Sequence, residues 1–322
     1  MRAIRIVGTG NPLVIQDIEK CSERPGLKIM EVSAASINHR DIWIWKGQYA
    51  GIKYPITPGS DACGFINGRR FIVNPGIHWG ENERFQSKAF YIIGLPEDGT
   101  FAEYVSVPED NLFEAPAHLS NIEAASLGIA SVTAYRSLQI RCKPQKGERL
   151  LVCGIGGGVA LFLVQFGLLM GCEVWVTTSL NEKLQQAINI GAKGGVLYTK
   201  ENWDIQLAEL VPKGFDIIID GYAGSAVSKY FKLASPGGRI CFYGGTGGKM
   251  NDLSPQILFW KQLQIMGSTM GSPKDFAEML EFINFHKMKP IIDKVFSMEQ
   301  ANQAFERMEH PERFGKVIFQ IN

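Results

Sequence analysis

Residues 148–160 read Glu-Arg-Leu-Leu-Val-Cys-Gly-Ile-Gly-Gly-Gly-Val-Ala and place four glycines within positions 154–158. An apolar run of strand length precedes the glycines, and an apolar segment long enough for about three helical turns follows them, up to Met170. Strand, glycine turn and buried helix open a dinucleotide-binding βαβ unit, because the turn is tight and a pyrophosphate must approach bare backbone. The unpaired amides and the dipole at the helix start favour an anion. We therefore expect the phosphates to bind at Gly154, Gly156, Gly157, Gly158 and Val159.

The next strand of this unit is expected at 172–177, where the ribose end of the cofactor should lie. Sites for NAD usually carry Asp or Glu at the tip of this strand, whereas residues 177–183 read Thr-Thr-Ser-Leu-Asn-Glu-Lys. The hydroxyls of Thr178 and Ser179, with Lys183 one turn later, suit a 2′-phosphate. The sequence therefore favours NADPH over NADH, although Glu182 keeps a ribose contact open.

The composition indicates an ordinary globular protein. The chain has 322 residues, which predicts two domains, and a net charge of +1, which gives no electrostatic case for nucleic acid or membrane partners. Residues 1–7 read as a strand and not as a signal peptide, and we find no apolar run of the roughly 20 residues that a bilayer requires. The six cysteines are scattered without a Cys-x-x-Cys motif, which indicates reduced thiols in a cytoplasmic protein.

The order of predicted elements gives an α/β fold. Residues 1–122 contain short strands separated by turn signals, which is typical of an antiparallel, barrel-like β domain. After that point strands alternate with helices, which indicates a parallel, doubly wound sheet. The strands expected in the first part are 1–7, 27–36, 62–66, 70–73 and 101–107. Later elements are helices at 122–139, 182–190, 226–233 and 275–286, and strands at 196–198, 216–220, 239–243 and 315–321.

Several short motifs, in this order, resemble the medium-chain dehydrogenase/reductase superfamily over essentially the whole chain. They are Asn38-His-Arg-Asp41, Pro58-Gly-Ser-Asp61, Asp98-Gly-Thr-Phe-Ala-Glu-Tyr104, Ala124-Ala-Ser-Leu127, the glycine turn, and Gly267-Ser-Thr-Met-Gly271. The resemblance implies a GroES-like catalytic domain at 1–122, to which 266–322 return, and a Rossmann domain at 123–265. It also implies a homodimer, for which pairing of edge strands of the Rossmann domains is a plausible route.

Many relatives hold a catalytic zinc, which needs three suitable ligands and an open position. By the resemblance, the three ligand positions here carry Asn38, Ser60 and Ile129. Isoleucine cannot coordinate a metal, and neutral Asn and Ser are poor zinc ligands. The region that would hold a structural zinc, 75–88, contains no cysteine. We therefore expect no bound zinc, and the chain resembles the zinc-independent, quinone-oxidoreductase-like branch.

The resemblance also assigns candidate site residues. Asn38 falls beside the nicotinamide, although a turn residue that caps local backbone is an equal alternative. The other positions, each of which also has a purely structural interpretation, are His39 near the pyrophosphate, Trp43 and Tyr49 as aromatic walls, Thr133 near the nicotinamide, Tyr198 beside the 2′-phosphate, and Gly244 and Gly245 under the nicotinamide. Arg40 replaces a small hydroxyl residue of the zinc enzymes, and Asp41 and Asp61 should form a buried polar network, with Arg40 a candidate partner.

These expectations lead to a first hypothesis, a zinc-independent NADPH-dependent oxidoreductase that transfers hydride to a quinone, an enone or a related activated carbonyl compound. Without a metal to polarise a carbonyl, the acceptor must already be activated. Two alternatives stay open. One is a zinc-type alcohol or aldehyde dehydrogenase with atypical ligands, and the other is an NADPH-binding sensor without significant turnover.

Overall fold

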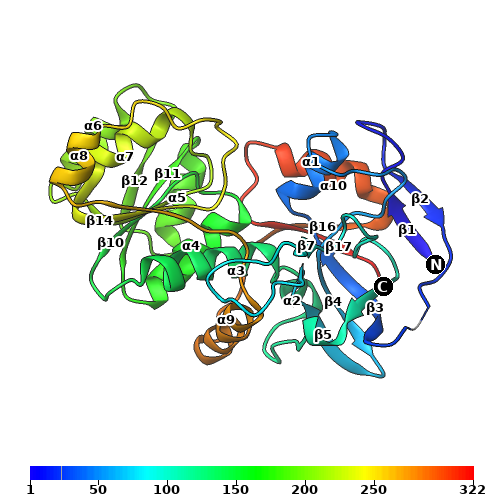
Figure 1. The fold of residues 1–322 in the computed structure, drawn as a ribbon. Coiled ribbons are helices and arrows are strands. Elements are labelled where there is room, and N and C mark those ends of the chain that lie inside the picture. The colour runs from blue at the N-terminus through cyan, green and yellow to red at the C-terminus, as the bar shows by residue number, and fades with distance from the viewer. Residues whose placement is uncertain (23) are drawn as a thin grey trace. The chain divides into compact units, whose positions relative to one another are not determined.

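The computed structural model describes residues 1–22 and 24–322. The chain forms two compact units (Figure 1): Met1–Val132 with Gly271–Asn322, here the first unit, and Thr133–Met270, here the second unit. Both boundaries lie later in the chain than the sequence predicts. The reason for the earlier one is that helix α2 (Asn121–Ala125) packs on strands β3 (Leu27–Ser36) and β4 (Asp61–Ile66) of the first unit.

The second unit is built on a six-stranded sheet in which every neighbouring pair is parallel. The strand order is β12-β11-β10-β13-β14-β15, which is the doubly wound order of dinucleotide-binding folds. Helix α4 lies on one side of this sheet and α6, α7 and α8 lie on the other (Figure 1). The strands are β10 (Arg149–Val152), β11 (Glu173–Thr178), β12 (Gly194–Leu197), β13 (Phe215–Asp220), β14 (Ala234–Phe242) and β15 (Gln264–Gly267).

Helices α4, α5 and α7 of the second unit begin and end close to their predicted bounds, whereas α6 and α8 are not among the predicted helices. Helix α4 (Gly158–Leu169) is apolar on nearly all sides and buries residues around most of its circumference, as expected for a helix inside a sheet crossover. The remaining helices are α5 (Asn181–Asn189), α6 (Trp203–Leu210), α7 (Val227–Leu233), α8 (Pro255–Trp260) and the short 3₁₀ turn Gly224–Ala226.

The first unit is built on a seven-stranded, mainly antiparallel sheet. Its path is β16-β17-β3-β4-β5-β9, with β8 paired to β3; among its pairs in the described structure, β16 and β17 run parallel and the others antiparallel. The C-terminal strand β17 therefore returns to the N-terminal part of the chain, as the resemblance implies. The other elements of this unit are β1 (Arg2–Arg5), β2 (Val14–Asp17), β5 (Arg69–Val73), β6 (Gly76–Ile77), β7 (Tyr91–Ile92), β8 (Tyr104–Pro108), β9 (Leu112–Glu114), β16 (Ile292–Ser297), β17 (Lys316–Gln320), α1 (His39–Trp45), α9 (Pro273–His286) and α10 (Ala301–Glu309), with 3₁₀ turns at Glu109–Asn111 and Met298–Gln300.

The single helix expected at 122–139 is wrong. The chain instead forms α2, then α3 (Ile129–Tyr135), which continues as a π-helical segment, Arg136–Cys142. The break falls at Gly128, whose φ of 142° lies outside the helical region and is readily adopted only by glycine.

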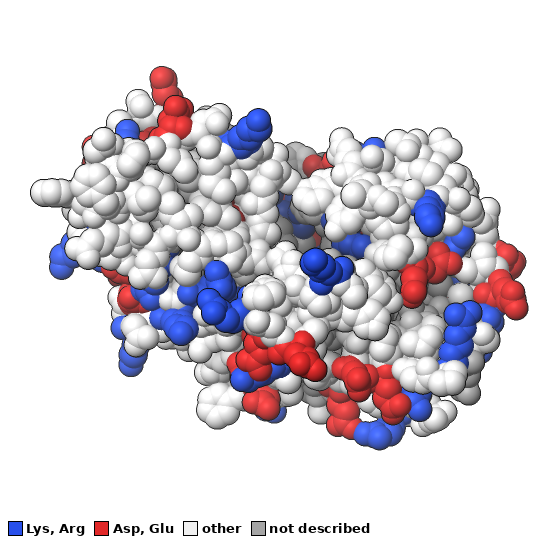
Figure 2. All heavy atoms as spheres, viewed as in Figure 1, with Lys and Arg blue, Asp and Glu red and all other residues white. Residues whose placement is uncertain are grey.

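The surface and the cysteines agree with an ordinary globular chain. On the face drawn in Figure 2, charged side chains of both signs are scattered between large uncharged areas. Five of the six free cysteines are buried. In the described part of the chain, no helix is long and apolar enough to cross a bilayer.

Candidate functional site

Asn38 and Asp41 lie at the start of helix α1, where Asn38 is the N-cap residue with an extended backbone. The Asn38 N–H donates a hydrogen bond of 2.8 Å to Asp41 Oδ2. The other oxygen of Asp41 accepts a hydrogen bond of 3.1 Å from the Gly59 N–H. This carboxyl group therefore connects the motifs 38–41 and 58–61. Burial raises the pKa of Asp41 to about 6, because water no longer solvates the charged form.

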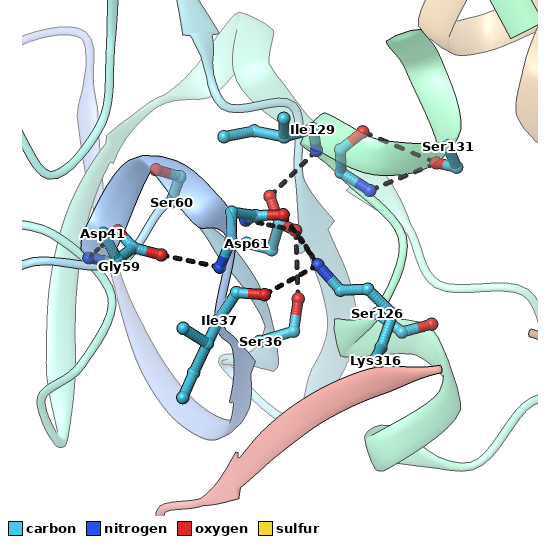
Figure 3. Close-up of polar contacts among 12 residues, drawn as sticks. Ser36, Ile37, Asp41, Gly59, Ser60, Asp61, Ser126, Ile129, Ser131 and Lys316 are labelled. Carbon is cyan, nitrogen blue, oxygen red and sulfur yellow. Dashed lines mark hydrogen bonds and ion pairs between the residues drawn. The ribbon is translucent and has the colours of Figure 1, made fainter. Parts of the chain in front are cut away.

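The side chain of Asn38 contacts a buried ion pair rather than capping the helix alone. Its Oδ1 accepts a hydrogen bond of 2.7 Å from Lys316 Nζ, and its Nδ2 donates one of 2.9 Å to Asp61 Oδ2. Lys316 Nζ and Asp61 Oδ2 are 3.3 Å apart, and their side chains are 3% and 0% exposed (Figure 3). We call these three residues the amide–ion-pair cluster.

Lys316 is the residue of this cluster that the sequence analysis missed. It begins strand β17 and stands directly before the apolar residues Val317, Ile318 and Phe319. A lysine at the start of a strand usually keeps its charge in water. The one signal in the sequence is its position next to a run that is wholly buried.

Two more donors complete the surroundings of Asp61. Ser36 Oγ donates to Asp61 Oδ2 at 3.0 Å, and the Ile129 N–H donates to Asp61 Oδ1 at 2.9 Å. The second contact explains the break before α3, because a Cβ at Gly128 would lie 2.3 Å from Asp61 Oδ1. The backbone of residues 128–129 can reach the carboxylate only because position 128 has no side chain.

Arg40 acts on the carboxylate of Asp41 through its charge, which opposes the rise in the pKa of Asp41, and the hydrogen bonds of its side chain in the described structure go elsewhere. Its guanidinium donates to Ser60 Oγ at 3.0 Å and to three carbonyl oxygens, those of Ile92, Ile93 and Leu95, at 2.9–3.1 Å. It also lies over the Tyr49 ring, 5.2 Å from the centroid. Arg40 therefore fixes the segment 92–95 and one of the predicted aromatic walls.

The residues at the three zinc-ligand positions do not fit a metal. The carbonyl oxygen of the Asn38 side chain is taken by Lys316, and Ser60 Oγ donates to Ile93 O at 2.7 Å while it accepts from Arg40. Ile129 offers the cluster only its backbone N–H. Within residues 1–22 and 24–322, no group of three or more His, Cys, Asp or Glu side chains could hold a metal ion.

The other candidates of the first unit lie on or near α1. His39 keeps an exposed surface, with its ring 6.3 Å from that of Trp43. Atoms packed around the imidazole lower the pKa of His39, and the nearby cations Arg313 and Lys316 lower it further. The imidazole is therefore neutral at neutral pH and can meet a phosphate only as a hydrogen-bond donor.

In the second unit, the glycine turn lies where strand β10 ends and is tied to strand β11. The Gly154 N–H donates to Thr177 Oγ1 at 3.0 Å, and the Ile155 N–H donates to Thr177 O at 2.8 Å. Gly154 has a φ of 70°, and a Cβ there would meet nothing within 4 Å, so bare backbone borders open space. Gly157 caps α4 without a side-chain oxygen, so the first N–H groups stay available to an anion. This turn fits the pyrophosphate of a dinucleotide.

The residues proposed for the 2′-phosphate differ in accessibility. Thr178 is fully buried, and its hydroxyl donates to Ile155 O at 3.4 Å, so it supports the turn. Ser179 is half-buried, and Tyr198 is 45% exposed. Lys183 is buried rather than solvated on its helix. Ser179 and Tyr198 are thus the accessible members of this set.

The remaining candidates have local structural roles. A Cβ at Gly244 would lie 2.5 Å from Gly221 O, so the neighbouring loop already requires glycine there, whereas Gly245 borders open space. The loop after β13 is held by Asp220, which accepts from the N–H groups of Tyr222 and Ala223 at 3.0 and 2.7 Å. Thr133 opens the second unit, and its carbonyl accepts a hydrogen bond from Ser137 Oγ.

Comparison with known proteins agrees with both units. Residues 24–117 match the family model of the alcohol dehydrogenase GroES-like domain, and residues 158–284 match that of the zinc-binding dehydrogenases. A zinc-type alcohol dehydrogenase-like protein, YogA, of Leptosphaeria maculans is 32% identical, over 96% of this chain and 95% of its own length. Human quinone oxidoreductase is 28% identical, over 99% and 97%. The crystal structure of an NAD-dependent alcohol dehydrogenase has a TM-score of 0.93 at 30% identity and full coverage of both chains.

The fold and these matches define a two-domain nicotinamide-dependent oxidoreductase. The chain belongs to the medium-chain dehydrogenase/reductase superfamily.

Proposed function

We propose that this chain is a zinc-independent, NADPH-dependent oxidoreductase that transfers hydride to a quinone, an enone or a related activated carbonyl acceptor. The proposal rests on the residues that stand at the three zinc-ligand positions, Asn38, Ser60 and Ile129. An amide held by an ion pair, a serine held by an arginine, and an isoleucine offer no metal site. The quinone oxidoreductase among the relatives supports the same branch.

The bound nicotinamide would supply the hydride, and this chain would supply binding, orientation and hydrogen bonds. The glycine turn and the start of α4 would hold the pyrophosphate, and Ser179 and Tyr198 would flank the 2′-phosphate. Hydride addition to an enone or a quinone moves an electron pair onto the acceptor oxygen, and water can then protonate the product. The Asn38 amide, with Trp43 and Tyr49 beside the acceptor, would bind that oxygen.

A second candidate is an NAD-dependent alcohol dehydrogenase with atypical ligands, which the names of several relatives favour. The two functions differ in cofactor, acceptor and metal. We would measure cofactor oxidation with a quinone, an α,β-unsaturated ketone and a simple aldehyde, each with NADPH and NADH. Turnover of the quinone or the enone with NADPH well ahead of NADH supports the proposal. Aldehyde turnover with NADH, abolished by a chelator, would replace it with the second candidate.

We also propose that the chain forms a homodimer through strand β15. Among the described strands, β15 pairs with β14 alone and ends the sheet of the second unit. Ile265 on this strand is 41% exposed, and Phe259 and Trp260 on α8 are 62% and 83% exposed. An open strand edge with apolar side chains favours pairing with a second copy. The five buried free thiols favour a reducing, cytoplasmic location.

A further inference from the structure

The two ends of the Asn38 side-chain amide face opposite charges. Oδ1 lies 2.7 Å from the Lys316 ammonium group, and Nδ2 lies 2.9 Å from Asp61 Oδ2. A flipped amide would place its NH₂ group against the ammonium and its oxygen against the carboxylate. Both contacts would then be repulsive. The ion pair therefore permits one orientation of the amide.

The ammonium and the carboxylate are fixed in turn. Lys316 has three N–H donors and three acceptors: Asn38 Oδ1, Asp61 Oδ2 and Ile37 O, the last at 3.1 Å. Asp61 accepts from Ser36 and from the Ile129 backbone as well. A buried ion pair is by itself weak evidence for stability, because desolvation offsets much of the attraction. The precision of this arrangement fits a positioning role better than a stabilising one.

One N–H donor of the Asn38 side-chain amide is left for a ligand. A side-chain amide has two N–H donors, and the hydrogen bonds of the described residues use one of the Nδ2 hydrogens, in the contact with Asp61. The ammonium at Oδ1 draws electron density through the amide, which strengthens the remaining N–H as a donor. Lys316 has no such donor left, since its three hydrogens are already bound.

We propose that the Lys316–Asp61 ion pair is a positioning device that aims the second Nδ2 hydrogen of Asn38 at the acceptor oxygen of a quinone or an enone. This inference rests on the proposed function. In that reaction the acceptor oxygen gains the electron pair displaced by hydride addition. A preorganised donor lowers the energy of that transition state more than that of the bound substrate. Lys316 and Asp61 are then positioning residues that act through Asn38.

The test is a double-mutant cycle with Lys316→Met and Asn38→Ala, measured as NADPH oxidation by a quinone. Lys316→Met keeps the side-chain stem and removes the charge. We expect each single variant to lower kcat by about 10- to 100-fold with a small change in the KM for NADPH. The double variant should lose no more than Asn38→Ala alone, because Lys316 acts through the amide.

Two results would overturn the proposal. One is a double variant in which the fold-loss of kcat equals the product of the fold-losses of the two single variants. The other is a loss in Lys316→Met that appears only in the KM for NADPH, which would make the lysine a cofactor ligand. Lys274→Met is the matched control, because Lys274 pairs with Glu83 at the same 3.3 Å but with both side chains about 60% exposed. It should leave kcat unchanged.

Lys316→Met leaves a buried carboxylate unpaired and could unfold the chain. The double variant Lys316→Met/Asp61→Asn removes both charges and keeps the shape of the cluster. It should fold and still show the reduced kcat. A normal kcat in this folded variant would exclude a positioning role.

A second readout separates this inference from the proposed function. In ¹⁵N-labelled protein, the two Nδ2 hydrogens of Asn38, assigned by their loss in Asn38→Asp, should differ in chemical shift more than those of the exposed Asn251, because only one of them meets Asp61. Lys316→Met should reduce the separation, whether or not a quinone is turned over. If the wild type oxidises NADPH with neither acceptor class but shows this separation, the proposed function fails and the fixed amide stands. A separation in the wild type no larger than that of Asn251 would contradict the fixed amide.

Discussion

The Gly154 N–H donates a hydrogen bond of 3.0 Å to Thr177 Oγ1, so the glycine turn after β10 is fastened to the end of β11. Neither residue needs to touch the cofactor with its side chain. The contact sets the turn in the conformation that a pyrophosphate must meet.

Replacement of Thr177 by valine should therefore weaken cofactor binding. The change keeps the side-chain shape but removes the acceptor, at a cost of about 1 kcal/mol. We expect the Kd for NADPH to rise about fivefold, measured by fluorescence titration. Ser228→Ala, which removes an exposed hydroxyl bonded to Ser225 O, is the control and should leave the Kd unchanged. Equal Kd values for Thr177→Val and the wild type would show that the turn holds without this contact.

Gly128→Ala should destabilise the first unit strongly. The added Cβ would lie 2.3 Å from Asp61 Oδ1, and the backbone has a φ of 142°. Clash and backbone strain together predict a loss of more than about 3 kcal/mol in the free energy of unfolding. Gly68→Ala has a positive φ of 77° but open space, so it should cost about 1–2 kcal/mol. Urea denaturation of both variants measures the difference, and similar losses would mean that the contact with Asp61 does not matter.

Asp41 should make the stability depend on pH. Burial raises its pKa to about 6, so the folded chain holds the proton more tightly than the unfolded chain. This contribution is present below about pH 4 and is lost as the pH rises through 6. Relative to Asp41→Asn, the wild type should therefore lose up to about 3 kcal/mol between pH 4 and pH 7. Urea denaturation at several pH values checks this, with the exposed Asp110→Asn as control. A rise in relative stability over the same range would contradict the assigned direction.

A charge on strand β15 should weaken the proposed dimer. Ile265→Lys places an ammonium group on the open edge, where a second copy would pair. We expect a lower dimer fraction in sedimentation velocity at micromolar concentration. Ile205→Lys, at a 54% exposed position on α6, should not change it. A wild-type chain that sediments as a monomer would contradict the proposed dimer.

Local sequence patterns predict many elements of this fold, because local interactions favour them, although the helices α6 and α8 are not among those predicted. Strand β3 has the predicted bounds 27–36, and the glycine turn lies between a strand and a helix as the pattern requires. The break at Gly128 could not be predicted in this way. The need for glycine there comes from Asp61, which is distant in the sequence and near in space.

In the candidate site, too, some features follow from the sequence and others depend on contacts between distant residues. The motif resemblance places Asn38 beside the nicotinamide and Asp61 in a buried polar network with Asp41. The hydrogen bond between Asn38 and Asp61 is seen only in the structure. The role of Lys316 could not be predicted from the sequence, because it depends on the packing of β17 against β3. The burial of Thr178 could not be predicted either, since exposure at a strand end depends on the turn that covers it, and the burial of Lys183 on helix α5 depends on tertiary packing.

The most direct test of this account is NADPH oxidation by a quinone in protein whose metal content has been measured by mass spectrometry. The account predicts turnover at full rate in protein with far less than one zinc per chain, before and after dialysis against a chelator. Turnover that disappears with the metal and returns with added zinc would contradict it.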